Sequence, residues 1–269
     1  MLKIHRLRNE VKSNRPLIHA ITNPISIHAC ANAILAIGGR PIMAEHPKEV
    51  EEITKTAAAL LLNLGNITDI RMESIRLSLK CANEKGIPVI LDAVGVACSA
   101  LRRNFVSDLL EIAVPTVIKG NYSEIQALYD SQYRSFGVDA DSALSESDMD
   151  DICITLSRKW DAIILASGKT DIVTDGKRLA HIRNGSEQLT SVTGTGCMLG
   201  ALSATYLSAD HSMDAVVAAC MMLGVCGQLS QTENGSGSFM VNLMDSLNII
   251  SDENLSNLID MEEKHLEEI

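Results

Sequence analysis

The feature that most constrains the fold of this sequence is an alternation of short apolar segments with longer segments of helical pattern. Most of the short segments are apolar at successive positions, as expected of parallel strands covered by helices on both faces. The six candidate strands are residues 17–21, 40–43, 59–64, 88–91, 116–118 and 162–166. Between them lie candidate helices such as residues 68–84, whose end is marked by Gly86 and Pro88. The alternation predicts an α/β fold, a three-layer α/β/α sandwich with a mostly parallel central sheet.

The pattern changes in the second half of the chain. Residues 171–185 hold two segments rich in β-forming residues on either side of Asp175-Gly176, a dipeptide that favours a tight turn. We predict a hairpin there that forms an antiparallel edge of the sheet. Helices are predicted at residues 195–207, 213–229, 239–250 and 254–266, and the polar stretch 139–151 is predicted to be a surface connection. We expect residues 1–269 to form a single domain, because α/β folds of this size often remain undivided.

Charge and cysteine content argue against several classes of protein. The 23 basic residues are outnumbered by 34 acidic residues, so the net charge is −11, and no Lys/Arg run forms a stripe that would neutralise nucleic-acid phosphates. The first residues lack the apolar core of a secretory signal, and no apolar stretch is long enough for a membrane span, so we expect a cytoplasmic protein. The seven cysteines include no C-x-x-C pair, which argues against a disulfide framework or a structural zinc site.

A glycine-rich segment before the predicted helix 195–207 is the first candidate for chemistry. Gly194, Thr195 and Gly196 open an apolar helix, so successive backbone N–H groups and the helix dipole favour an anion there. Cys197 lies in the first turn, where the same field favours a thiolate, and is the cysteine best placed to accept a proton. The alternative is that the glycines only allow tight packing and that Cys197 is an inert core residue.

Two carboxylates follow predicted strands and are candidates for a metal site. Asp92 comes directly after residues 88–91, and Glu124 follows residues 116–118, so both are expected at the carboxyl edge of the sheet, where open α/β folds bind ligands. With no cation expected beside them, they suit water-mediated binding of Mg²⁺ next to nucleotide phosphates. Alternatively, Glu124 caps or solvates a helix and Asp92 is a helix N-cap. Lys119 either contacts a phosphate or extends its ammonium into solvent.

The chain contains an ordered set of motifs, which are Pro16-Leu-Ile-His-Ala-Ile-Thr-Asn23, Ala31-Asn32, Arg40-Pro-Ile-Met-Ala44, Asn63-Leu-Gly65, Leu91-Asp-Ala-Val-Gly95, Lys119-Gly-Asn-Tyr-Ser-Glu124, Val192-Thr-Gly-Thr-Gly-Cys-Met-Leu-Gly-Ala201 and Gly235-Ser-Gly-Ser-Phe239. With these motifs the chain resembles the hydroxyethylthiazole kinases of thiamine salvage, from about residue 5 to about residue 250. This family belongs to the ribokinase-like kinases. The resemblance implies ATP-dependent phosphorylation of the primary alcohol of 4-methyl-5-(2-hydroxyethyl)thiazole with Mg²⁺, in a homotrimer whose thiazole pockets lie between subunits.

The resemblance also implies roles for individual residues. It places Cys197 at the position of the catalytic base, with the anion hole for the transferred phosphoryl group formed by Gly194, Thr195 and Gly196. The implied magnesium-site residues are Asp92 and Glu124. Positions that contact ATP fall on Lys119, Asn121 and Ser167, and positions that line the thiazole pocket fall on Asn23, Met43 and Gly194.

This sequence departs from the family pattern at several positions. Ala93 stands where the family usually has proline, and Lys119 replaces the usual arginine, which keeps the charge but loses bidentate phosphate binding. His28 and Ala29 stand where the family usually has Asn-Asp near the substrate pocket, which leaves open a related kinase for a hydroxymethylpyrimidine or pyridoxal-like alcohol. A third alternative is a nucleotide-binding protein without turnover, which a buried and unreactive Cys197 would favour.

Overall fold

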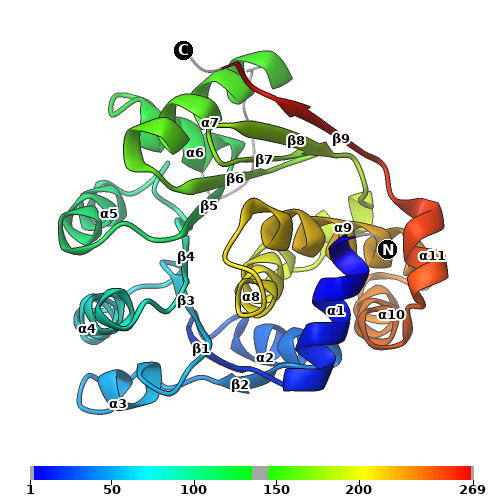
Figure 1. The fold of residues 1–269 in the computed structure, drawn as a ribbon, viewed down its shortest axis with the longest axis horizontal. Coiled ribbons are helices and arrows are strands. Elements are labelled where there is room, and N and C mark those ends of the chain that lie inside the picture. The colour runs from blue at the N-terminus through cyan, green and yellow to red at the C-terminus, as the bar shows by residue number, and fades with distance from the viewer. Residues whose placement is uncertain (1–2, 135–144, 268–269) are drawn as a thin grey trace.

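The computed structural model describes residues 3–134 and 145–267, and within these ranges nine strands form one sheet (Figure 1). The strands are β1 (Leu17–Ile21), β2 (Arg40–Ile42), β3 (Ala59–Asn63), β4 (Val89–Asp92), β5 (Val117–Asn121), β6 (Ile163–Ser167), β7 (Asp171–Thr174), β8 (Arg178–Ile182) and β9 (Met261–His265). Their order across the sheet is β2-β1-β3-β4-β5-β6-β7-β8-β9. Strands β1 to β6 pair in parallel, and β7, β8 and β9 are added antiparallel.

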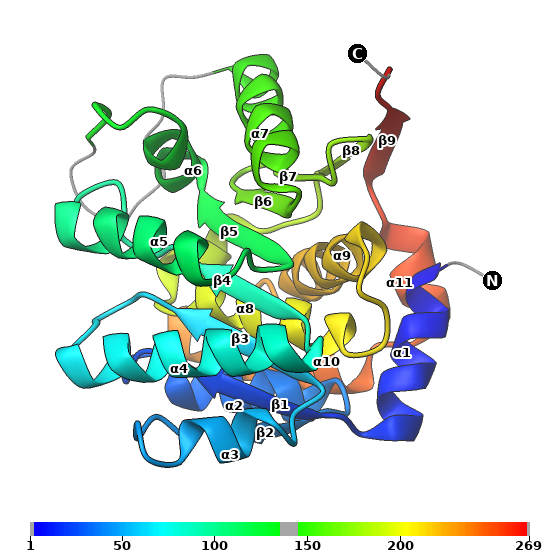
Figure 2. The same cartoon turned by 60° about the vertical axis from the view of Figure 1, so that its left-hand side comes forward.

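The helices divide between the two faces of the sheet, and Figure 2 shows α4 and α5 on the side opposite to α8. One face carries α3 (Val50–Thr54), α4 (Asp69–Lys85), α5 (Ala100–Ile112), α6 (Tyr122–Tyr129) and α7 (Glu146–Trp160). The other carries α1 (Lys3–Asn14), α2 (Ile27–Ala36), α8 (Thr195–Leu207), α9 (Met213–Leu229), α10 (Ser236–Ile249) and α11 (Asp252–Leu258), with a 3₁₀ turn (Glu187–Ser191) before α8. The predicted three-layer sandwich is therefore confirmed.

Alternation along the central strands separates two hydrophobic layers. In β3, Ala59 and Leu61 pack toward α8 and α9, whereas Leu60 and Leu62 pack toward α4 and α5. Both sets are completely buried, which explains why the strand is apolar at successive positions. Because side chains alternate along a strand, Asn63 faces the same layer as Leu61, beneath the start of α8.

The predicted helix 254–266 is wrong in its second half. Helix α11 ends at Leu258, and residues 261–265 form β9. Glutamate and lysine favour helix in isolation, but here the backbone pairs with β8, which would otherwise have an open edge. Arg183 N donates to Asp260 O, and Asp260 N donates to Asn184 Oδ1, so side-chain and backbone contacts both direct the chain into the sheet. The predicted hairpin is confirmed, but β9 rather than the hairpin forms this edge.

The other predicted strands and helices are confirmed to within a few residues, although β5 continues to Asn121 and α10 begins earlier, at Ser236. Residues 139–144 of the predicted surface connection lie outside the described residues. The prediction is wrong for residues 146–151, which form the first turns of α7.

None of the helices in the described ranges combines the length and the apolar character that a bilayer span requires.

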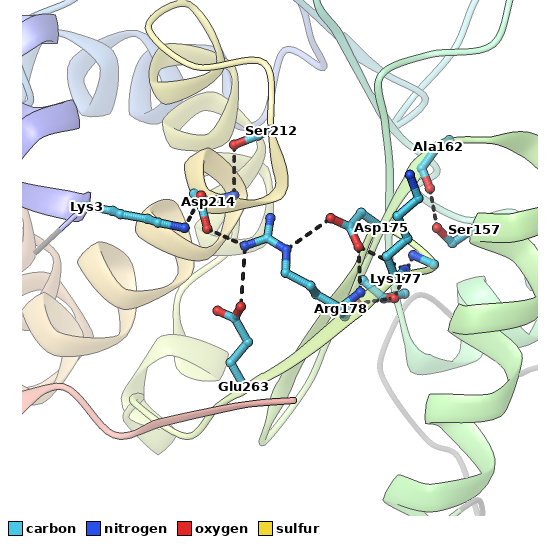
Figure 3. A network of polar contacts seen from close by, with 11 residues as sticks. Lys3, Ser157, Ala162, Asp175, Lys177, Arg178, Ser212, Asp214 and Glu263 are labelled. Carbon is cyan, nitrogen blue, oxygen red and sulfur yellow. Dashed lines mark hydrogen bonds and ion pairs between the residues drawn. The ribbon is translucent and has the colours of Figure 1, made fainter. Parts of the chain in front are cut away.

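Arg178 joins separate parts of the chain at one end of the sheet (Figure 3). Its guanidinium donates to Asp214 Oδ1 at the start of α9 (2.9 Å), to Asp175 Oδ2 in the hairpin turn (3.3 Å) and to Glu263 Oε1 on β9 (3.4 Å). Lys3 Nζ donates to the other oxygen of Asp214 (2.7 Å). Burial opposes ionisation of Asp214, but the hydrogen bonds from Lys3 and Arg178 outweigh it, so the pKa of Asp214 lies below its ordinary value. These ion pairs connect α1, α9 and β9 to the hairpin formed by β7 and β8.

Replacing Arg178 should therefore weaken the fold. Arg178→Met is expected to lower the free energy of unfolding by about 1–2 kcal/mol, because it leaves partly buried carboxylates without their shared cation. Urea unfolding followed by circular dichroism measures the change. Because the pKa of Asp214 is depressed in the folded chain, the difference in unfolding free energy between the parent and Arg178→Met should be present at neutral pH and decline below about pH 4.

Arg183→Met is the matched control for this experiment. Arg183 pairs with Glu262, and their side chains are 38% and 67% exposed, so this pair should contribute less than about 0.5 kcal/mol. Equal losses in the two variants would show that the Arg178 network has no special part in stability.

Candidate active site

Polar residues occupy the last positions at which β3, β4 and β5 pair with one another. Asn63 on β3 pairs with Asp92 on β4, and Asp92 pairs with Lys119 on β5. Two residues earlier on each strand, the same face carries buried apolar side chains. Asn63, Asp92 and Lys119, here called the polar row, are themselves at most 3% exposed. The row lies at the carboxyl edge of the sheet, where ligands of open α/β folds bind.

Helix α8 begins above the polar row with a turn that requires glycine. Gly194, the N-cap residue, has φ +96°, and a side chain there would meet Ser26 at 3.0 Å. The hydroxyl of Thr195 donates to the carbonyl of Leu189 (2.8 Å), which ties the turn to the preceding 3₁₀ segment. The first backbone N–H groups of a helix have no partner within it, so the predicted anion-binding turn has the required backbone.

The sulfur of Cys197 contacts two side-chain amides in the first turn of α8. Asn63 Nδ2 lies 3.3 Å from Sγ, and Asn23 Nδ2 lies 3.4 Å from it. Burial raises the pKa of the Cys197 thiol, and the charge of Asp92 raises it further, although Lys119 and Asn23 act in the opposite direction. Burial and the nearby carboxylate therefore oppose the thiolate that the helix start is predicted to favour.

Asp92 and Lys119 form a buried ion pair. Lys119 Nζ donates to Asp92 Oδ1 (2.9 Å), and Asn63 Nδ2 donates to Asp92 Oδ2 (2.8 Å). Burial raises the pKa of Asp92, whereas Lys119 and Asn63 act to lower it. Burial also disfavours the charged form of Lys119, but Asp92 raises the pKa of Lys119 above its ordinary value. The expectation that no cation lies beside the carboxylates is wrong, and Lys119 does not extend into solvent.

Glu124 caps α6, and its carboxylate is repelled by the charge of Asp92. Its Oε2 accepts from Asn121 N (2.8 Å) and its Oε1 from Gly95 N (2.7 Å), while Asn121 Oδ1 accepts from Glu124 N (2.8 Å). The helix-capping alternative is thus confirmed for Glu124, whereas Asp92 ends a strand and caps no helix. Burial, followed by repulsion from Asp92, raises the pKa of Glu124 to about 7 despite these two hydrogen bonds.

The two carboxylates fit a hydrated divalent cation better than a directly ligated one. In the part of the chain that the structure describes, no group of three or more His, Cys, Asp or Glu side chains is arranged to hold a metal ion. The oxygens of Asp92 and Glu124 already accept hydrogen bonds from the protein. Lys119 compensates Asp92, and the repulsion that raises the pKa of Glu124 would be relieved by a further positive charge.

The remaining predicted residues lie on either side of the polar row. Ser167 ends β6, and its Oγ donates to Gly120 O on β5 (3.3 Å). Asn121 pairs in register with Ser167. Met43 follows β2 at the other side and packs, half-buried, against the hydrophobic layer beneath α8. The structure thus brings together Asn23, Asp92, Lys119 and Cys197, whereas Ser167 and Met43 lie toward opposite ends of the site.

Two residues of the site had no role predicted from sequence. Asn63 donates hydrogen bonds to both Asp92 and Cys197. The sequence pattern that could have identified it is a polar residue at the end of an apolar strand, on the same side of the strand as Leu61. Asp171 accepts from Gly168 N (3.1 Å) and so holds the turn that follows Ser167. No sequence pattern distinguishes that aspartate from an ordinary turn residue.

Comparison with known proteins extends the agreement to nearly the whole chain. A family model described as the hydroxyethylthiazole kinase family matches residues 8–253. The hydroxyethylthiazole kinase 2 of Clostridium botulinum (strain Hall) is 44% identical over 253 residues, which cover 92% of this chain and 96% of the relative.

Solved structures agree with this result. The hydroxyethylthiazole kinase protein from Pyrococcus horikoshii OT3 superimposes with a TM-score of 0.91 at 30% identity, over 98% of this chain and 100% of that one. A ribokinase-like superfamily protein from Enterococcus faecalis V583 has a TM-score of 0.65 at 11% identity, over 95% of each chain, and shows the fold alone. The residues matched by the family model include the polar row and the glycine turn of α8. The chain is ribokinase-like in fold and belongs to the hydroxyethylthiazole kinase family.

Proposed function

We propose that this protein transfers the terminal phosphoryl group of ATP to the primary alcohol of 4-methyl-5-(2-hydroxyethyl)thiazole, a step of thiamine salvage. Family membership over residues 8–253 supports the reaction and the substrate. The observation that carries the chemistry is the position of Cys197, which joins the N-terminal turn of α8 to the polar row. A proton acceptor, an anion-binding turn and a carboxylate are thereby combined at one place.

Cys197 is the proposed base. In the molecules whose Cys197 is ionised, the alcohol oxygen forms a bond to the terminal phosphorus of ATP, the bond from that phosphorus to ADP breaks, and the alcohol proton passes to the thiolate, which becomes a thiol. Backbone N–H groups of the turn formed by Gly194, Thr195 and Gly196 stabilise the charge of the transferred group. Because burial favours the thiol form of Cys197 in the free protein, we expect slow turnover.

Asp92 and Glu124 are the residues proposed to hold Mg²⁺ through water. Bound there, the ion would neutralise charge on the ATP phosphates. Burial is the main cause of the raised pKa of Glu124, and repulsion from Asp92 is the second; a cation at this position would oppose the repulsion. Proposed contacts with ATP involve Lys119, Asn121 and Ser167, and the proposed lining of the thiazole pocket comprises Asn23, Met43 and Gly194.

A homotrimer with thiazole pockets between subunits is also proposed, with residues 1–269 acting as one domain in each subunit. The domain is supported by the continuity of the sheet from β2 to β9. Support for the trimer comes from large apolar side chains that are more than half exposed on the neighbouring helices α2 and α10 and on the turn before α2. They are Ile25, Leu35, Val241 and Ile249.

The function is tested by ADP release from the parent protein and from variants of Cys197. Release should depend on the thiazole alcohol. Cys197→Ala and Cys197→Ser should lose about 10²–10⁴-fold in kcat, because neither side chain accepts a proton as a thiolate does. Cys197→Asp should retain or raise kcat, since a carboxylate is ionised at neutral pH.

Two controls accompany this assay. Cys98→Ser changes an exposed cysteine outside the site and should leave kcat unchanged. Pyridoxal and a hydroxymethylpyrimidine, offered in place of the thiazole alcohol, should be poor acceptors. Full turnover with either of them would reassign the substrate. ATP consumption that does not depend on an acceptor would refute the proposed kinase activity. If all three Cys197 variants were fully active, the role of the cysteine would be structural.

Removal of either carboxylate should shift the magnesium requirement. Asp92→Asn and Glu124→Gln should each raise the Mg²⁺ concentration for half-maximal activity by about 10–100-fold, because each removes charge from the outer shell of the ion. Activity titrated with Mg²⁺ after treatment with a chelator measures this shift. Asp108→Asn, on the exposed surface of α5, is the control for the loss of one negative charge. Unchanged magnesium titrations would remove both residues from the metal site.

Dilution tests the proposed trimer independently of the phosphoryl-transfer reaction. If two subunits form each pocket, affinity for the thiazole alcohol should fall as the protein dissociates, and Val241→Glu should cause the same loss at higher concentration. Calorimetric binding combined with sedimentation velocity measures both effects. Leu101→Glu places the same charge on α5, on the other face of the sheet, and should have no effect. A monomer with full affinity would exclude the shared pocket.

A further inference from the structure

Asn63 lies completely buried between the carboxylate and the thiol of the site. It ends β3, in register with Asp92 on β4, and faces the layer beneath α8. An uncharged amide in such a position must satisfy its polar atoms internally, since an unpaired buried polar group costs about 1–3 kcal/mol. Its hydrogen bonds therefore show which orientation the surroundings impose.

The orientation of the Asn63 amide is determined by its neighbours. The backbone N–H of Gly65 donates to Oδ1 (2.8 Å), and because a backbone N–H can only donate, the oxygen must lie on that side. Nδ2 then faces the opposite side, where it donates to Asp92 Oδ2 (2.8 Å) and Cys197 Sγ (3.3 Å). Oδ1 also accepts from Asn23 Nδ2 (3.3 Å), so both hydrogens and both lone-pair positions of the amide are used.

The sulfur of Cys197 consequently faces N–H donors from two side chains. Asn23 is oriented in the same manner as Asn63, because its Oδ1 accepts from two backbone N–H groups of the turn that follows it, at 3.1 Å each. Two N–H groups directed at one sulfur stabilise it as an acceptor, and they do so most strongly when it carries negative charge. Burial and the charge of Asp92 disfavour a negative charge on the sulfur, so the hydrogen bonds from the two amides counteract the main influences on the pKa of Cys197.

We infer that Asn63 is a positioning residue for phosphoryl transfer: by donating to Asp92 and to Cys197 at once, its amide holds the sulfur ready to accept the alcohol proton at a set distance from the carboxylate. This inference rests on the proposed role of Cys197 as base. Asn63 acts through its two neighbours, and no contact with substrate is required. Its loss should therefore reduce kcat and leave KM for both substrates nearly unchanged.

Asn63→Asp tests this role with little change of shape. One oxygen can still accept from Gly65 N, while the other replaces the donor and faces Asp92 and Cys197. We expect kcat to fall by about 10–100-fold, with KM values within about threefold of the parent. We also expect alkylation of Cys197 by iodoacetamide, followed on the Cys197 peptide by mass spectrometry, to require a pH higher by about one unit or more.

Asn63→Ser removes the two donated hydrogen bonds without adding charge, and it should give both changes in the same direction. If circular dichroism shows that Asn63→Asp does not fold, Asn63→Ser replaces it in the test. Asn83→Asp, at an exposed position in the last turns of α4, is the matched control for the charge and should match the parent in kcat and alkylation.

The results distinguish this inference from the proposed function. Folded Asn63 variants with parental kcat, with a raised KM alone, or with an unchanged alkylation profile would overturn the inference. If those results accompany an inactive Cys197→Ala protein, the base role of Cys197 stands and only the role of Asn63 fails. A fully active Cys197→Ala protein would refute the base role and the inference together.

Discussion

A carboxylate buried at the end of β4 determines how the rest of the site is built. An ionised Asp92 without partners would cost several kcal/mol at this depth. The adjacent strands supply the compensation, because their register places the Asn63 amide and the Lys119 ammonium on its two oxygens at 2.8 and 2.9 Å. That register is set by the apolar side chains below the polar row. A slip of one residue would turn both partners to the opposite face of the sheet.

The same carboxylate acts on both the thiol and the proposed metal position. Burial, and after it the charge of Asp92, raises the pKa of Cys197 and of Glu124, so both groups hold their protons more strongly in the free protein than they would in isolation. In the free protein the sulfur of Cys197 is therefore held mainly as the thiol, which is less nucleophilic than the thiolate.

The sequence predicted the parallel strands well because they are buried on both faces. It predicted Asp92 and Glu124 at the edge because each follows a predicted strand, and Cys197 in the first turn of a helix because a glycine-rich segment precedes it. It did not predict how these groups meet. The pairing of Lys119 with Asp92 depends on inter-strand register, and the pKa of Cys197 depends on burial and on a residue more than a hundred positions away. Likewise, the local sequence of β9 favours helix, and only the open edge of β8 decides otherwise.

Strand β9 also protects the molecule against self-association through its sheet. It is the outermost strand at this end, and its side chains after Met261 are exposed and mostly charged: Glu262, Glu263, Lys264 and His265. A neighbouring sheet could extend this edge only by stripping water from those charges, whereas β8 alone would present the largely apolar run from Leu179 to Ile182. Residues 261–265 thus cover the edge that β8 would otherwise expose, and a truncation before Met261 would replace a charged edge with a largely apolar one.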